Sequence, residues 1–345
     1  MTAGQAPPSL ARRLARPRSV ASVLVAAVLL GFSLYRLGPE TLADTWQLMR
    51  GTNPWLYLAA LGVYYGAFPL RALRWRILLE NAGVEADKMP RLRHLAEIIY
   101  LSWFANALTP AKLGDLYRGW LLRKVRGASW SRAMGTIVAE RLLDVLVLVV
   151  LMIATGLVAY RPLLRGNAPR GMQCNLPLPA ADLGPSLLKV FLAGGAVAAM
   201  VLAGLVVFAR FGTHLERVLP GRLGAIYLRF SGALVLSFGR FAPLLILSLG
   251  AWAAEAGRFL LVGRAMGQSL PITLVFFFSL ASAFLTTVPV TPGGVGFEFL
   301  LAGALCLRGF PAADAWALAL ADRSLSYLSL VVGGAILYAW SPRTK

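Results

Sequence analysis

The chain reads Thr109-Pro110-Ala111-Lys112-Leu113-Gly114 at the end of one apolar segment and Thr291-Pro292-Gly293-Gly294-Val295-Gly296 at the end of another, 182 residues later. Both stretches share the pattern Thr-Pro-x-x-x-Gly. Proline interrupts a helix because it has no amide hydrogen and its ring collides with the preceding turn. Each stretch therefore predicts a sharp break between two helices inside an apolar region.

The same shift of 182 residues brings other residues into register without a gap. Arg126-Gly127 falls on Arg308-Gly309, and Glu140-Arg141 falls on Asp322-Arg323. Matches of leucine carry little weight in so apolar a chain. Matches of proline, glycine and intramembrane arginine at one offset are informative, and they indicate an internal duplication.

The composition indicates a membrane protein. Of the 345 residues, 58% are hydrophobic and only 14% are charged, whereas about a quarter of the residues in a soluble domain are charged. The 34 lysines and arginines outnumber the 15 acids. In a chain this apolar, the excess indicates cationic loops on the cytoplasmic side rather than a nucleic-acid-binding face. Two cysteines and two histidines suggest neither a disulfide framework nor a metal site, and we expect no cofactor.

Six segments are long and apolar enough to cross a bilayer as helices, which takes about 20 residues. They are 19–37, 54–70, 134–160, 188–208, 241–262 and 316–340. Two further apolar segments, 94–108 and 271–290, run directly into the Pro/Gly turns. Arginines and lysines flank the first of them on both sides. This pattern places both of its ends in the cytoplasm and predicts a re-entrant hairpin.

The sequence therefore predicts an all-α polytopic membrane protein with an inverted repeat of three transmembrane helices and one re-entrant hairpin in each copy. This gives six crossings and two hairpins, with eight full crossings as the alternative. An odd number of crossings inverts the second copy, as in alternating-access transporters. The expected location is a bacterial plasma (inner) membrane, with both termini cytoplasmic. The predicted parts are a basic cytoplasmic tail (1–18), a first repeat (19–160, hairpin about 94–124), an external loop (161–187), a second repeat (188–340, hairpin about 271–308) and a cytoplasmic tail (341–345).

Charged residues occur inside or beside the apolar segments, where each costs roughly 2.5 to 3.5 kcal/mol at the bilayer centre unless it is paired or hydrated. The acids are Glu97, Asp115, Glu140, Asp144, Glu255, Glu298 and Asp322, and the cations are Lys112, Arg118, Arg141, Arg258 and Arg323. Two interpretations are open. The charges form ion pairs that lock helices together, or they line a central cavity that holds an anionic headgroup on its cations and an amine or a proton on its carboxylates.

The two turns favour the cavity. Helices that begin after the Thr-Pro pairs would point unpaired N–H groups and positive dipole ends into the protein, where they would attract an anion. Glycines would let the backbone approach a phosphate closely, and the lysine would add a cation. The candidate residues of the turns are Thr109, Pro110, Lys112, Gly114, Thr291, Pro292, Gly293, Gly294 and Gly296.

Three arginines follow the second predicted span. Arg71 and Arg74 fit a cytoplasmic interfacial anchor. Arg76 falls on Arg258 in the register of the repeat. Since Arg258 follows Glu255 by about one helical turn, we expect it either to pair with Glu255 or to contact a ligand.

Four motifs occur together in an order that resembles a known family. They are Arg71-x-x-Arg74-Trp75, Pro110-x-x-x-Gly114-Asp115-x-x-Arg118, Glu140-Arg141-x-x-Asp144 and Pro292-Gly293-Gly294-Val295-Gly296. Over roughly residues 54–340 the chain resembles the transmembrane, flippase-like domain of lysylphosphatidylglycerol synthases and its stand-alone relatives. The resemblance implies translocation of a lipid with a charged headgroup by two facing re-entrant hairpins.

Bifunctional members of that family carry a soluble aminoacyl-transferase domain after the membrane part. This chain ends at Lys345, so that activity is not expected. Two positions depart from the family pattern. Asp115 stands where the family usually has glutamate, and Glu298 lies one residue before the usual acid.

The expected function is transbilayer translocation of a lipid with a phosphate-containing headgroup, without enzymatic activity. Phosphate would dock on the turns with Lys112, Arg118, Arg141 and Arg323, while Glu140, Asp144 and Asp322 would balance a cationic headgroup or carry protons. The expected partners are anionic or zwitterionic phospholipids or polyprenyl-phosphate lipids, not nucleic acid, and a homo-oligomer is left open. The alternatives are a membrane-embedded transferase acting on a polyprenyl-phosphate lipid and a carrier of small solutes or ions.

Overall fold

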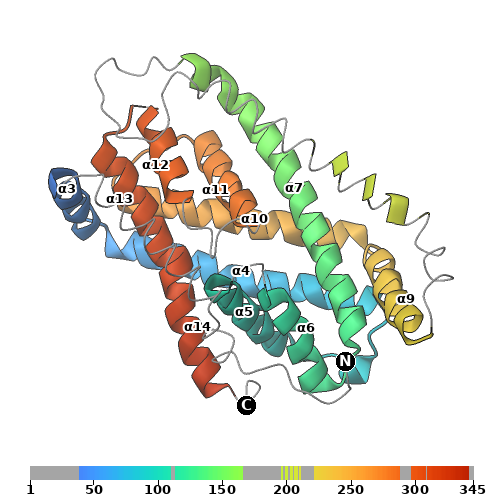
Figure 1. Cartoon of the computed structure of the whole chain (residues 1–345). Helices are drawn as coiled ribbons and strands as arrows, with labels where there is room; N and C mark the ends of the chain where they lie inside the picture. Colours follow the sequence, from blue (N-terminus) through green and yellow to red (C-terminus); the bar gives the residue numbers. More distant parts are fainter. Residues whose placement is uncertain are drawn as a thin grey trace.

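The computed structural model describes residues 39–109, 113–165, 221–287, 297–307 and 309–341, together with several single residues between 196 and 210. Within these residues all regular secondary structure is helical (Figure 1). The elements are α3 (Pro39–Arg50), α4 (Pro54–Asn81), η1 (Ala86–Lys88), α5 (Leu92–Leu108), α6 (Leu113–Arg126), α7 (Trp130–Arg165), α9 (Gly221–Leu236), α10 (Phe241–Ala265), α11 (Ile272–Thr287), α12 (Phe297–Leu307), α13 (Ala312–Arg323), η5 (Ser324–Leu328) and α14 (Ser329–Trp340).

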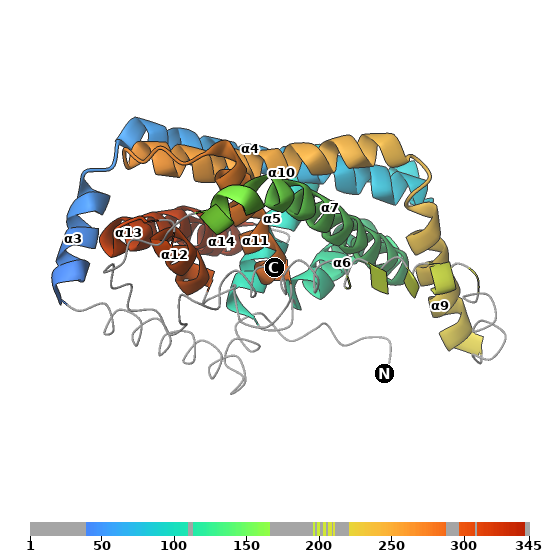
Figure 2. The ribbon, with the colours of Figure 1, turned by 90° about the horizontal axis from the view of Figure 1, so that it is seen from above.

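Helices α4 and α10 lie side by side and antiparallel (Figure 2). At one end, the amide of Asn53 donates to the carbonyl of Ala265 at 2.7 Å. At the other end, the side-chain amide of Asn81 donates to the carbonyl of Ser237 at 2.8 Å. The start of α4 is encoded locally, because Asn53 caps it with a side-chain oxygen that accepts from the amides of Trp55 and Leu56, and proline is favoured in the next position.

Two pairs of short helices flank this central pair. In Figure 1, α5 and α6 lie below α4, and α11 and α12 lie above α10. The longest of the four, α5, has 17 residues and a length of about 25 Å, less than the roughly 30 Å of a bilayer core. The first pair is in backbone contact at Gly114, where an added Cβ would lie 2.0 Å from the carbonyl oxygen of Ser102.

Two long helical runs cross the central pair (Figure 1). The first is α7, which packs against α6, α9 and α11. The second is the continuous run α13–η5–α14, in which α13 contacts α3 and α12, and α14 contacts α5.

The second run contains one turn of π-helix, η5, where the regular i to i−4 hydrogen bonds are interrupted. Two tyrosine hydroxyls of α4 lie against this turn. Tyr57 lies 2.7 Å from the hydroxyl of Ser324, and Tyr64 donates to the carbonyl of Ser326 at 2.9 Å. Side chains of α4 therefore bond to the irregular turn.

Length and composition identify three candidate membrane spans in the described part of the chain: Pro54–Asn81, Phe241–Ala265 and Ala312–Trp340. They contain the predicted spans 54–70, 241–262 and 316–340. The predicted span 134–160 lies within α7, which at 36 residues is longer than any of the three. Segment 19–37 lies outside the described residues, as does most of 188–208.

Candidate functional site

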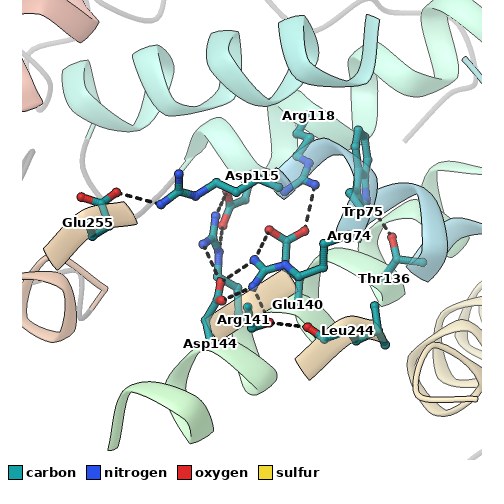
Figure 3. Close-up of polar contacts among 12 residues, drawn as sticks. Arg74, Trp75, Asp115, Arg118, Thr136, Glu140, Arg141, Asp144, Leu244 and Glu255 are labelled. Atoms are coloured by element: carbon teal, nitrogen blue, oxygen red, sulfur yellow. Dashed lines mark hydrogen bonds and ion pairs between the residues drawn. The ribbon is translucent and has the colours of Figure 1, made fainter. Parts of the chain in front are cut away.

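The centre of the molecule contains a buried cluster of charged side chains from α4, α6 and α7 (Figure 3). Arg74 of α4 is 2% exposed. Its guanidinium donates to Asp144 at 2.6 Å and to Glu140 at 3.0 Å, both on α7. It also donates to the hydroxyl of Ser248 on α10 at 2.8 Å, so one side chain connects three helices.

The spacing of the α7 residues explains how they converge. Glu140 and Asp144 are four residues apart and therefore share one helix face. Arg141, one position further round, reaches Asp115 of α6 with two parallel bonds of 2.9 Å. Such a bidentate pair fixes the orientation of the guanidinium as well as its charge. Asp115 also accepts from Asn106 of α5 at 3.2 Å, which ties the α5–α6 pair to α7.

Arg118 of α6 differs from its neighbours. It is fully buried, and its Nη2 donates to Glu140 at 2.8 Å. Its guanidinium lies 3.8 Å from the centroid of the Trp75 ring, and that indole donates to the hydroxyl of Thr136 at 3.2 Å. Among the described residues, Nε and Nη1 of Arg118 have no hydrogen-bond partner.

A second cluster connects α4, α10 and α13. Arg71 donates to Glu255 at 2.7 Å. Arg258 donates to the same carboxylate at 3.3 Å and bonds Asp322 with its Nη1. The guanidinium of Arg71 lies 4.5 Å from the centroid of the Trp103 ring. Both clusters thus contain an arginine of α4.

One further carboxylate has a partner at the edge of these clusters. Glu298, at the start of α12, pairs with Arg323 of α13. Asp115, at the start of α6, pairs in the same way with Arg141 of α7. The one-residue departure of Glu298 from the family pattern therefore does not prevent this pairing.

The structure brings most of the described candidate residues together as ion pairs. Asp115, Arg118, Glu140, Arg141 and Asp144 lie in the first cluster, and Arg258 and Asp322 lie in the second. In this conformation the pairs agree with the interpretation that charges lock helices together. Of the turn residues, Thr109 bonds the carbonyl of Ala105 and Gly114 lies at the α5–α6 contact. The others lie outside the described residues: Pro110, Lys112, Thr291, Pro292, Gly293, Gly294 and Gly296.

Two central residues were assigned wrongly from the sequence. Arg71 and Arg74 are buried ion-pair partners, not interfacial anchors. The number of charges could have indicated their role. Seven acids lie in or beside the apolar segments, but only five cations were assigned there, so two acids lacked a partner. Arg76 and Arg258 match in the 182-residue register, but their contacts differ. The Arg76 side chain is 44% exposed and pairs with Glu80.

Comparison with known proteins agrees with the motifs. Residues 19–334 match the family model described as the lysylphosphatidylglycerol synthase TM region. A UPF0104 membrane protein of Methanocaldococcus jannaschii is 29% identical over 68% of this chain and 93% of that protein. One from Methanothermobacter thermautotrophicus is 25% identical over 85% of each.

Another relative is glycosyltransferase AglD of Haloferax volcanii, 25% identical over 92% of this chain. The alignment covers 54% of AglD, so this chain spans about half of that relative. These relatives are archaeal. With a family match over most of its length and several membrane-spanning helices, the chain is a multi-pass membrane protein that belongs to the lysylphosphatidylglycerol synthase TM region family.

Proposed function

We propose that the protein moves a lipid with a phosphate-containing headgroup between the two leaflets, with the headgroup in the protein and the acyl chains in the bilayer. Arg118 carries the proposal. It is a fully buried arginine that, among the described residues, makes one ion pair and has two buried nitrogens without a partner. A guanidinium with N–H groups that are not hydrogen-bonded is suited to bind a phosphate.

The ion pairs would permit an exchange of partners. A phosphate that binds Arg118 would replace Glu140, and Glu140 would keep its bond to Arg74. Removing one partner of a buried pair normally leaves an uncompensated charge, which is costly. Here the shared carboxylate avoids that cost, so the headgroup can enter without stranding an acid.

An inverted repeat supports this mechanism. Shifting α3, α4, α5 and α6 by 182 residues gives ranges that overlap α9, α10, α11 and α12, and shifting α7 gives the run α13–η5–α14. The contacts recur as well. Helix α3 packs against α13 as α9 packs against α7, and α5 packs against α14 as α11 packs against α7. We propose that the pairs α5–α6 and α11–α12 are re-entrant hairpins that enter from opposite faces, with both termini in the cytoplasm.

The test is lipid movement in reconstituted vesicles. The purified protein is placed in phosphatidylcholine vesicles with fluorescent phosphatidylglycerol, and dithionite quenches the label in the outer leaflet. We expect the full protein to expose inner-leaflet label. We expect R118Q to slow the exposure of inner-leaflet label by about tenfold or more, because a charge-assisted bond to the phosphate is lost. R76Q, which removes an exposed arginine of α4, should not. Movement at the same rate in R118Q and wild type would refute the mechanism.

A membrane-embedded transferase is the second candidate, because one relative is named a glycosyltransferase. Its alignment leaves nearly half of that relative uncovered, so the name alone assigns no activity to this chain. We propose that this chain is not itself an enzyme. Formation of a glycosylated product from a labelled polyprenyl-phosphate sugar donor, in detergent and without other proteins, would reverse this ranking.

A further inference from the structure

The five arginines of the two clusters fall into two groups according to the carboxylates they contact. Three of them contact two carboxylates each, and we call these the clamp arginines. These contacts are Arg74 with Glu140 and Asp144, Arg141 with Asp115 and Asp144, and Arg258 with Glu255 and Asp322. In the described residues, Arg118 and Arg71 contact one carboxylate each, Glu140 and Glu255 respectively.

Arg71 and Arg118 also share their surroundings. Both are at most 4% exposed. Arg71 lies on the ring of Trp103 at 4.5 Å, and Arg118 lies on the ring of Trp75 at 3.8 Å. Both have buried nitrogens without a partner among the described residues, Nη1 in Arg71 and Nε and Nη1 in Arg118. An indole on the face of a guanidinium holds it while leaving its edge donors available.

The carboxylate of each is shared with a clamp arginine. Glu140 also accepts from Arg74, and Glu255 also accepts from Arg258. Either arginine can therefore leave its carboxylate without leaving an unpaired buried acid. Arg74 differs in that its departure would remove a bond from two carboxylates together.

We propose that Arg71, held on Trp103, is a second phosphate-binding position that accepts the headgroup phosphate in exchange for Glu255. This rests on the proposed function and adds a second position to the same path. Arg118 lies on α6, while Arg71 bonds α10. Arg71 is three residues from Arg74, which bonds the carboxylate that Arg118 also bonds. The two positions are thus adjacent through α4.

The experiment must separate phosphate binding from neutralisation of Glu255. R71Q removes the cation, and the double variant R71Q/E255Q removes both charges, with the glutamine at position 255 keeping the shape of the glutamate. In the double variant Arg258 keeps its partner Asp322. R76Q, on the same helix, is the matched control. Folding is checked by gel filtration and thermal unfolding in detergent, and lipid movement is measured in the vesicles described above.

We expect R71Q and R71Q/E255Q both to slow movement of fluorescent phosphatidylglycerol by about tenfold or more, with R76Q unchanged. Recovery of the wild-type rate in R71Q/E255Q would overturn the proposal, because Arg71 would then serve only to neutralise Glu255. If R118Q is slow but R71Q is not, the second position fails and the proposed function stands.

A parallel measurement distinguishes a lipid headgroup from free phosphate. Uptake of radiolabelled inorganic phosphate is followed in the same vesicles. Lipid movement that depends on Arg71, without phosphate uptake, supports the proposal as stated. Phosphate uptake that depends on Arg71, without lipid movement in the wild type, would overturn both the lipid ligand and the proposed function.

Discussion

Arg74 is the single side chain on which most of the first cluster depends. Its guanidinium bonds α7 through Glu140 and Asp144 and bonds α10 through Ser248. Removing one partner of a buried ion pair destabilises a protein by about 3–5 kcal/mol, because the remaining charge stays buried. We expect R74Q to lower the thermal unfolding temperature in detergent clearly, and R76Q to leave it nearly unchanged. Equal unfolding temperatures for the two variants would contradict the central role of Arg74.

Gly114 is needed for the backbone contact between α5 and α6. A Cβ at this position would lie 2.0 Å from the carbonyl oxygen of Ser102 and 2.7 Å from the side-chain oxygen of Asn106. Backbone cannot move aside easily, so we expect G114A to cost about 1–3 kcal/mol or more and to reduce the yield of folded protein. Gly62 is the matched control, since nothing lies within 4 Å of an added Cβ there. G62A should be neutral or slightly stabilising, and the two variants are compared by thermal unfolding.

At the scale of single residues, the sequence identifies the acids of the site better than their partners. An acid in an apolar segment needs a partner wherever it lies, so Glu140, Asp144 and Asp322 stand out without a structure. An arginine at the end of an apolar segment has two explanations, an interfacial anchor or an internal partner. Only the path of α4 beyond residue 70 decides between them for Arg71 and Arg74.

At the scale of elements, the helices follow from apolarity and from local stop signals. The predicted segments 94–108 and 241–262 correspond to α5 (Leu92–Leu108) and α10 (Phe241–Ala265). By contrast, α4 continues eleven residues past the predicted end at 70, because the arginines there have internal partners. The π turn η5 was not predicted. It involves hydroxyls of α4 that are more than 260 residues away in sequence, and no local pattern encodes such a contact.

The π turn makes Tyr64 a test of how α4 holds the long run α13–η5–α14. The Tyr64 hydroxyl is bonded to the carbonyl of Ser326, and its side chain is 2% exposed. Y64F would leave a buried carbonyl without this donor, a loss of about 1–3 kcal/mol. We expect a lower unfolding temperature and faster amide exchange in residues 324–330.

Tyr227 provides the control for this substitution. Its hydroxyl is buried and has no hydrogen-bond partner among the described residues. Y227F should therefore leave stability unchanged or raise it. Equal effects of Y64F and Y227F would show that the bond to Ser326 contributes nothing to holding the turn.

At the scale of the whole molecule, the buried charges balance. In the described residues the ion pairs of the clusters and their edge join six arginines to six carboxylates. The chain as a whole carries a net charge of +19, so the excess lies outside this interior. The duplication is a prediction from the sequence, where glycine, proline and charged residues match at one offset. The way that arginines of one helix serve both clusters is not visible, because it depends on α4 and α10 lying side by side.

The antiparallel arrangement of α4 and α10 predicts which loops share a face of the membrane. Gly51 precedes α4 and Ser269 follows α10, and the bond from Asn53 to Ala265 joins these two ends. At the opposite ends of the two helices, Ala86 begins η1 a few residues after α4, and Ala242 is the second residue of α10. All four positions are exposed.

Cysteine labelling tests this arrangement. After both native cysteines are replaced by serine, single cysteines at these four positions are labelled with an impermeant maleimide in intact cells. With the N-terminus in the cytoplasm, we expect G51C and S269C to react from outside, and A86C and A242C to react only after the membrane is permeabilised. Labelling of all four from one side would mean that α4 and α10 do not span the bilayer, and the proposed inverted repeat would then lose its two central helices.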